Sequence, residues 1–376
     1  MAVSRFGFLP AEIQKLYNRQ VNLRERYFDN AATTPLDPRV LEEMLPYLRD
    51  DWGNAHSIHA QGLRAMQGVD TARERIAMLV GADDPAEIAF TSGATEANNW
   101  VLRGFTAGSI GPFEHSSVKE PAEALGYQVL RNQGEYVLPP DSNQPIISLM
   151  AVNNEIGTIF QASAMRNHTD ILHSDLTQAI GKVTPDLDGL DFGSLSGHKF
   201  YGPKGVGALY ARGAAWPDQL LRGGEQEFGA RAGTLNVPSI VGMGVAAAIA
   251  ADEGAHDREL ARELRAIVLE GLSQVSDVQV NGGDQTVPHI LSLSFRGIEG
   301  ESLVVELDAR AFAISSGAAC SSRSTEPSHV LTALGLEQEW LRGTVRISFG
   351  RFNTKEAARE LGRELEFAVN RLRRKT

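Results

Sequence analysis

Lys199 has the chemistry and the surroundings of an amine nucleophile. It follows a short apolar run, and two of its neighbours, Ser196 and His198, are polar residues that can serve a site. A lysine that is partly desolvated in such a place can have a lowered pKa and attack a carbonyl carbon to form a Schiff base. Lys204 is a second choice for this role, because it lies in a Gly-Pro-Lys-Gly stretch typical of a turn.

Asp175 ends a second apolar run, and Gln178 follows three residues later. An aspartate in this position can simply cap a helix. A pyridoxal-5′-phosphate (PLP) ring, however, requires a carboxylate beside its pyridine nitrogen. The ion pair keeps that nitrogen protonated and lets the ring accept the electrons of a substrate carbanion. We expect Asp175 to form this pair and Gln178 to reach the phenolic oxygen of the ring.

The residues Gly93, Ala94 and Thr95 stand between a predicted strand and a predicted helix. Backbone N–H groups that are free at a helix N-terminus, together with the helix dipole, form a site for an anion such as phosphate. Ser196 and His198 are expected to add a hydroxyl and an imidazole donor. The stretch is not a P-loop, since the Gly-Lys-Ser/Thr ending is missing.

Cys320 is the one cysteine of the chain, which excludes an intrachain disulfide and a four-cysteine metal site. A lone cysteine is usually a small buried apolar residue. Its neighbours from Ser315 to Ser322 are small, whereas a core cysteine has bulky apolar neighbours. A loop of small residues favours exposure, so the sequence predicts a nucleophilic thiolate at Cys320.

These residues need a scaffold that brings them together, and the pattern of apolar runs predicts one. The runs alternate with helical patterns, which indicates an α/β fold with a large, mostly parallel sheet and helices on both faces. Ligands of such sheets bind at the carboxyl ends of the strands, where four of five predicted strands end in polar residues. The predicted strands are residues 87–90, 146–152, 171–174, 192–195 and 205–210.

The chain changes character from about Ala255. A charged helix is predicted for residues 257–272, followed by strands near residues 290–295 and 344–349 and a final charged helix. We therefore expect two domains. Residues 38–254 form the large one, and residues 1–37 and 255–376 form a smaller α+β domain that carries the Cys320 loop. A helix start is also predicted at Pro10, but the sequence indicates no function for residues 1–26.

Composition excludes several classes of protein. The net charge of −11 argues against a broad nucleic-acid interface. The N-terminus has no apolar core long enough for a signal peptide, and the apolar stretch at residues 240–251 is too short to span a bilayer. We therefore expect a cytoplasmic protein without membrane contact.

The assembled motifs closely resemble those of the cysteine desulfurases of the NifS/IscS type. These belong to the class V aminotransferases, a family of fold-type I PLP enzymes. The resemblance runs from about Tyr27 to near the C-terminus. The motifs are Asp29-Asn30-Ala31-Ala32-Thr33-Thr34-Pro35, Thr91-Ser92-Gly93-Ala94-Thr95-Glu96, Val152-Asn153-Asn154-Glu155-Ile156-Gly157, Ser196-Gly197-His198-Lys199, Arg231-Ala232-Gly233-Thr234 and Ser315 to Ser322.

The resemblance implies roles that the residues alone do not reveal. His115 would stack on the PLP ring and move protons, and Asn154 would lie near the ring and the substrate. Arg346 would bind the substrate carboxylate through two hydrogen bonds. Thr234 would reach the phosphate in a second subunit, which implies a homodimer. The remaining contacts would come from Lys199 as the Schiff base, from Asp175 and Gln178, and from Ala94, Thr95, Ser196 and His198 at the phosphate.

The implied reaction converts L-cysteine to L-alanine and leaves the sulfur on Cys320 as a persulfide. An acceptor protein would then take the sulfur, for iron–sulfur assembly or for another thiolation pathway. One alternative is a selenocysteine lyase or cysteine C–S lyase that does not need Cys320. Another is an interaction protein that kept the fold without activity. Leu176, Phe228 and Ala230 depart from the family pattern: an alanine is usual at the first position and basic residues at the other two.

Overall fold

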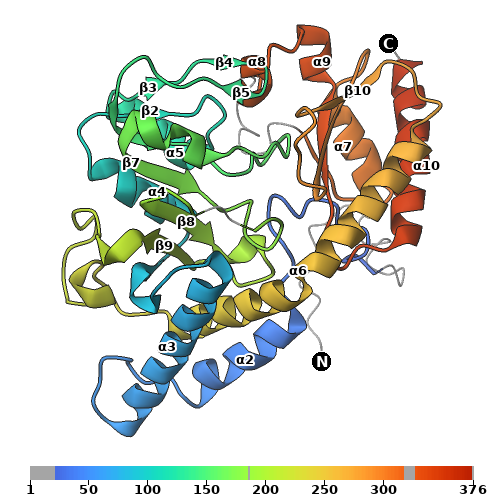
Figure 1. The fold of residues 1–376 in the computed structure, drawn as a ribbon. Helices are drawn as coiled ribbons and strands as arrows, with labels where there is room; N and C mark the ends of the chain where they lie inside the picture. The colour runs from blue at the N-terminus through green and yellow to red at the C-terminus, as the bar shows by residue number, and fades with distance from the viewer. Residues whose placement is uncertain (1–21, 185–186, 317–326, 375–376) are drawn as a thin grey trace.

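The computed structural model describes residues 22–184, 187–316 and 327–374. Two sheets lie in different parts of the molecule, and one long helix, α6 (Val237–Gly271), runs past both of them (Figure 1). Cys320 and the predicted helix start at Pro10 fall outside the described residues.

The larger sheet confirms the predicted fold class. It has seven strands, and all neighbouring pairs are parallel except those of β9, which runs antiparallel to β1 and β8. In spatial order the strands are β1 (Ile88–Thr91), β9 (Gly207–Ala211), β8 (Phe192–Ser196), β7 (Thr169–Asp175), β6 (Gln144–Ser148), β2 (Ser109–Ile110) and β3 (Gln128–Val129).

Helices cover both faces of this sheet. Successive residues of a strand point to opposite faces, so neighbouring residues contact different helices. On β9, Leu209 joins an apolar cluster with α4 (Ala94–Arg103) and α5 (Ser116–Ala124). Its neighbour Ala208 joins a different cluster, formed with α2, α3 and α6.

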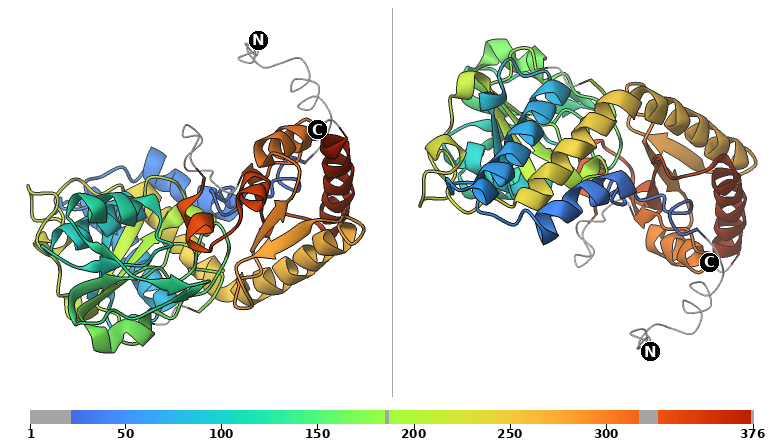
Figure 2. Two further views of the ribbon diagram at one scale, coloured as in Figure 1. Left: turned by 90° about the horizontal axis from the view of Figure 1, so that it is seen from above. Right: turned by 90° about the horizontal axis from the view of Figure 1, so that it is seen from below.

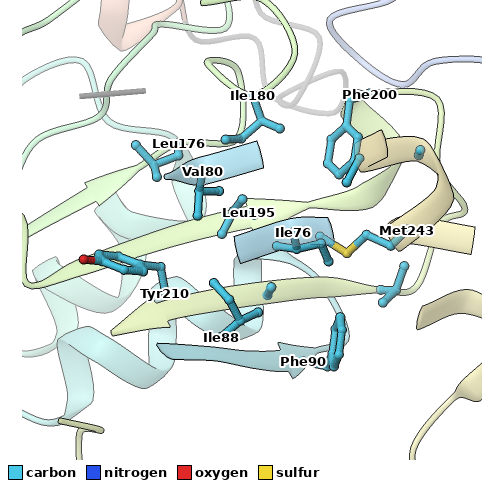
Figure 3. Packing of buried hydrophobic residues seen from close by; sticks show 14 of the residues in the cluster. Ile76, Val80, Ile88, Phe90, Leu176, Ile180, Leu195, Phe200, Tyr210 and Met243 are labelled. Atoms are coloured by element: carbon cyan, nitrogen blue, oxygen red, sulfur yellow. The ribbon is translucent and has the colours of Figure 1, made fainter. Parts of the chain in front are cut away.

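The second cluster lies under three helices that pack side by side (Figure 2). They are α2 (Pro38–Arg49), α3 (Ala60–Val80) and the first part of α6. Figure 3 shows Ile76 of α3 and Met243 of α6 near Leu195 of β8. The sheet is thus buried on both faces, as parallel sheets require.

The smaller sheet is antiparallel and has its own core. Its strands are β10 (Val278–Asn281), β11 (Ile290–Phe295), β13 (Thr344–Ser348) and β12 (Ser315–Ser316). The helices α7 (Gly300–Asp308) and α10 (Lys355–Arg373) pack with the last part of α6 around this core. Two short helices, α8 (His329–Ala333) and α9 (Gln338–Arg342), precede β13, and a small hairpin joins β4 (Asn132–Gln133) to β5 (Tyr136–Val137).

The start of one predicted helix is wrong. The sequence suggested a charged helix from residue 257, but α6 already begins at Val237 and continues to Gly271. Its first turns are apolar and pack against α3. They lack the charged residues by which the second half was recognised as a helix, so the sequence did not show that both halves form one helix. The predicted domain boundary between residues 254 and 255 falls inside α6. Although α6 is long and apolar enough to cross a membrane, more than half of its apolar window is buried within the protein.

One predicted strand is too long at its end. Residues 146–152 were expected to form a single strand, whereas β6 ends at Ser148. The next residues leave the ladder and enter a turn in which the side-chain oxygen of Asn153 accepts the N–H groups of Glu155 and Ile156. This turn directs Asn154 to the carboxyl edge of the sheet.

Candidate active site

The carboxyl ends of β7 and β8 open into a cavity of about 590 Å³. β7 ends at Asp175, and β8 ends at Ser196, where the single-turn 3₁₀ helix Gly197–Lys199 begins. Ten of the twelve predicted site residues line this cavity: Ala94, Thr95, His115, Asn154, Asp175, Gln178, Ser196, His198, Lys199 and Arg346.

The amine of Lys199 is fixed in the cavity by the N-terminal part of the chain. Its Nζ donates hydrogen bonds to the carbonyl oxygens of Ala31 at 2.7 Å and Ala32 at 2.9 Å. The side chain is half-buried, so the amine is held in place and partly removed from water. Lys204, the second choice, also lines the cavity, but its side chain is exposed.

Asp175 is buried and is oriented by two donors. Its Oδ1 accepts the N–H of Thr177 at 2.9 Å, and its Oδ2 accepts the Nδ2 of Asn98 at 2.9 Å. Gln178 is buried beside it, where its Nε2 donates to the carbonyl oxygen of Ala31 at 2.8 Å. The cavity therefore has a rigid carboxylate and a rigid amide on the wall that β7 forms.

The end of the cavity beside α4 offers hydrogen-bond donors. Ala94 and Thr95 are the first two residues of α4, where backbone N–H groups lack acceptors within the helix. Ser196 is buried nearby. Burial, with a smaller effect from the charges of Lys199, Lys204 and Lys182, lowers the pKa of His198 to about 4, so its imidazole is neutral. This end can accept an anion without a charged side chain.

Close packing of the main chain between β9 and the turn before α4 brings the N-terminus of α4 to the cavity. A Cβ on Gly207 would lie only 2.6 Å from the Cα of Gly93, the residue that precedes α4. Only glycine at position 207 lets the turn before α4 approach β9 so closely. The N-terminus of α4 is thereby held against the same sheet edge as Ser196.

His115 lies just before α5 and is the N-cap of that helix. Its Nδ1 accepts the N–H of Ser117 at 3.1 Å and lies 2.8 Å from the hydroxyl of Ser117. Burial lowers the pKa of His115, and the positive charges of Lys199 and His329 act in the same direction, against Asp175. The ring is therefore a neutral group at the cavity wall.

Arg346 brings a guanidinium from β13 of the smaller sheet into the cavity wall. Its Nη1 donates to the carbonyl oxygen of Asn154 at 2.8 Å, and its Nη2 pairs with Asp29 at 2.7 Å. Its buried Nε has no acceptor among the described residues. The guanidinium is rigid and still has an unused donor, as expected for a group that receives a carboxylate.

Two predicted residues are not among the described residues that line the cavity. Thr234 is exposed, at the end of the segment that the ion pair between Arg231 and Glu96 holds against α4. Cys320 lies outside the described residues. After that gap, Ser328 donates to Glu155 at 2.6 Å and the Nε2 of His329 contacts the carbonyl oxygen of Glu114 at 2.9 Å. These contacts attach α8 to residues adjacent to Asn154 and His115.

The three departures from the family pattern lie in packed surroundings or at the surface. Leu176 belongs to the core cluster beneath the sheet and is not among the cavity-lining residues (Figure 3). Ala230 is buried in the cluster around α4 and α5. Phe228 is exposed, with a φ of +59°, and its ring contacts the guanidinium of Arg73.

The sequence analysis missed three residues that organise this site. Asn98 lies one turn after Ala94 on α4 and contacts Asp175. Ser117 contacts His115, and Lys182 donates to the Oε1 of Gln178 at 2.6 Å. The spacing of four residues between Gln178 and Lys182 was a usable signal for the last contact, whereas the contact between Asn98 and Asp175 joins distant segments.

Comparisons with known proteins agree with this geometry. The family model described as aminotransferase class-V matches residues 26–361. Cysteine desulfurase IscS of Dictyoglomus turgidum is 40% identical over 378 residues, which cover 93% of this chain and 96% of that protein. Among solved structures, a NifS-like protein has a TM-score of 0.82 at 33% identity, covering 92% of this chain and 99% of that one. The structure of SspA in complex with cysteine has a TM-score of 0.73 at 33% identity, covering 88% and 100% of the two chains. The chain therefore belongs to the aminotransferase class-V family and, within it, to the cysteine desulfurases of the NifS/IscS type.

Proposed function

We propose that this chain is a PLP-dependent cysteine desulfurase that uses L-cysteine as its substrate. The observation that supports this most is the convergence of Lys199, Asp175 and Gln178 on one cavity that also holds a helix N-terminus and Arg346. A relative of similar fold, SspA, has been solved in complex with cysteine.

The residues of the cavity fit the cofactor in chemical type. Asp175 offers a buried carboxylate for a pyridinium nitrogen, and Gln178 offers an amide for a phenolic oxygen. The N-terminus of α4, with Ser196 and neutral His198, suits the phosphate. When bound, PLP supplies an aldehyde that joins to amines and a ring that accepts electrons from the substrate.

Lys199 is the group that would hold the cofactor covalently and later release it to the amine of the substrate. Its Nζ is already held by two carbonyl oxygens, which orient the amine without neutralising it. Arg346 would bind the carboxylate of cysteine, since its guanidinium is buried, rigid and beside Asn154. His115 would cover the cofactor ring from the α5 side.

Cys320 would take the sulfur. In the overall reaction the Cβ–S bond of L-cysteine breaks, alanine leaves, and a sulfur–sulfur bond forms on the Cys320 thiolate. Ser315 is the strand neighbour of Arg346 in the smaller sheet, and Ser328 contacts Glu155, which adjoins Asn154. Described residues on both sides of the Cys320 segment are thus next to cavity-lining residues or their neighbours.

The wider setting is part of the same proposal. The enzyme is a cytoplasmic homodimer in which the exposed Thr234 reaches the phosphate of the partner site. It delivers persulfide sulfur to an acceptor protein, for iron–sulfur assembly or another thiolation pathway. No direct contact with nucleic acid or membrane is expected.

The test is to measure alanine and enzyme-bound sulfur formed from L-cysteine by the holoenzyme. Wild-type protein should form both. Lys199→Ala should form neither, and Lys355→Met, which removes an exposed lysine paired with Glu263, should behave as wild type. Cys320→Ala should lose both products. Alanine formation that survives in Cys320→Ala would favour a lyase, and no alanine from wild-type holoenzyme would refute the proposal.

A further inference from the structure

The contacts of His115 define which of its ring nitrogens holds the proton. The N–H of Ser117 points at Nδ1 over 3.1 Å. A backbone N–H can only donate, so Nδ1 must present a lone pair. A neutral imidazole has one protonated nitrogen, and in His115 this nitrogen is then Nε2.

The hydroxyl of Ser117 is oriented in the same sense by its neighbours. Asn98 donates through Nδ2 to the Oγ of Ser117 at 2.8 Å and to the Oδ2 of Asp175 at 2.9 Å. The ionised carboxylate of Asp175 only accepts, so it fixes the amino end of the Asn98 amide. With its oxygen accepting from Asn98, Ser117 has its single proton left for Nδ1 of His115, 2.8 Å away.

Because Asn98 is buried, reversing the direction of these hydrogen bonds would cost free energy. Asn98 is completely buried, and its Oδ1 has no partner among the described residues. Turning the amide would place that oxygen against the Asp175 carboxylate and leave two acceptors facing each other. The orientation of Asn98 is therefore set by its donors.

The charges around His115 keep the ring neutral. Burial is the largest influence and lowers its pKa, and Lys199 and His329 also lower it, whereas Asp175 opposes them. Because the net shift is downward, the ring stays unprotonated on Nδ1 near neutral pH.

We propose that Ser117 and Asn98 are positioning residues that hold His115 as the neutral tautomer protonated on Nε2, with the Asp175 carboxylate as the fixed end of the chain. The consequence for catalysis rests on the proposed function. In this tautomer Nε2 donates a hydrogen bond and has no lone pair with which to remove a proton. The base that takes the Cα proton of cysteine is then the amine of Lys199, whose lone pair forms the new N–H bond while the electron pair remains on the substrate.

The inference can be tested on the holoenzyme labelled with ¹⁵N-histidine. Long-range ¹H–¹⁵N spectra distinguish protonated from unprotonated ring nitrogens, and His115→Gln identifies the signals of His115 among the nine histidines. In the wild type, Nδ1 of His115 should be unprotonated and Nε2 protonated at neutral pH. A proton on Nδ1, or a doubly protonated ring, would overturn the proposal.

Four variants test the hydrogen-bond chain itself. Ser117→Ala removes the hydroxyl, and Asn98→Leu removes the amide at similar volume. Each should shift the tautomer ratio toward Nδ1 protonation by roughly fivefold, the worth of one ordinary hydrogen bond. Ser117→Thr keeps a hydroxyl and should restore the wild-type spectrum. Asn99→Leu is the matched control, because the side-chain amide of Asn99 donates to the main-chain oxygens of Thr95 and Ser117 and not to the Oγ of Ser117 or to Asp175 in the described structure.

Unchanged spectra in both Ser117→Ala and Asn98→Leu would refute the roles of these side chains. The two mutations remove different members of the hydrogen-bond chain. If one variant does not fold, the spectrum of the other still tests the proposal. Alanine formation measured on the same samples separates this inference from the proposed function. Wild-type protein that makes no alanine but shows the Nε2 tautomer would refute the desulfurase and support the positioning roles.

Discussion

The Nζ of Lys182 donates a 2.6 Å hydrogen bond to the Oε1 of Gln178, and both side chains are buried. Burial lowers the pKa of Lys182 to about 7, and the charges of Lys199 and Arg346 act in the same direction. Because the amine donates to Oε1 while Nε2 donates to the carbonyl oxygen of Ala31, the orientation of the Gln178 amide is set, and Nε2 keeps one N–H for another group. Lys182 thereby fixes the polarity of the amide that is proposed to face the phenolic oxygen of the cofactor.

The Lys182→Met variant should change how stability depends on pH. Between pH 7 and 10.5 an unfolded chain protonates this lysine and the folded chain does not, so the folded state gains stability as pH rises. The unfolding free energy of wild type should rise relative to that of Lys182→Met by on the order of 4 kcal/mol across this range. Urea unfolding at several pH values measures it. Lys355→Met, at an exposed ion pair, should show no such trend.

Comparison with Glu155→Gln should reveal a pH dependence of the wild-type unfolding free energy that has the opposite sign. Burial raises the pKa of Glu155 from 4.5 to about 7, against the hydrogen bond from Ser328 and the charge of Arg346. The folded chain therefore binds an extra proton between these pH values, and wild-type stability falls as pH rises. Relative to Glu155→Gln, the loss should be about 3 kcal/mol, again measured by urea unfolding. The exposed Glu259→Gln is the control, and parallel curves for wild type and Glu155→Gln would contradict the prediction.

Arg346→Lys should weaken the use of cysteine while the protein stays folded. Lysine keeps the charge but cannot form two parallel hydrogen bonds to a carboxylate. The kcat/KM for alanine formation should fall about 10- to 100-fold, mainly through a higher KM. Arg296→Lys alters an exposed arginine paired with Glu337 and should have no effect. An unchanged KM with a reduced kcat would place the role of Arg346 elsewhere.

Much of the scaffold was predictable because strand ends are visible in the sequence. Asp175 and Lys199 each follow an apolar run, and parallel strands bring such ends to one edge. The direction of the hydrogen bonds was not predictable. Asn98 and Ser117 meet Asp175 and His115 only after α4 and α5 have packed on the sheet. Polar residues inside a helical pattern give no sign of which tertiary partner they will meet.

The surroundings of Leu176 were not predictable from the sequence either. Leu176 follows Asp175 and stands where the family usually has alanine. Its side chain fills the core beneath the sheet, since alternate residues point to opposite sides. The length of α6 was underestimated for a related reason, because its buried first half has no polar face to reveal the helical period.

Breaking the ion pair between Arg73 and Glu227 by removing one partner should strongly destabilise the protein near the segment that leads to Thr234. Both side chains are buried, and two contacts of 2.8 Å join them, while Glu227 also accepts the N–H of Phe90 at 2.6 Å. Glu227→Gln should lower the unfolding free energy by about 3–5 kcal/mol, because Arg73 is left buried and unpaired.

The matched control for this pair is the double variant Arg73→Met with Glu227→Leu, which removes both charges. It should lose much less than Glu227→Gln, since no buried charge remains unpaired. Denaturant unfolding compares the three proteins. Losses in the double variant that equal or exceed those of the single variant would show that the pair itself, and not the stranded charge, accounts for the effect.

The central claim is that PLP is bound through Lys199. Reducing the holoenzyme with borohydride fixes the cofactor to its amine, and peptide mass mapping then locates it. The account predicts the modification on Lys199, in the peptide that contains Ser196 and His198. Modification of Lys182 or Lys204 instead, or no modification of a holoenzyme that forms alanine, would contradict it.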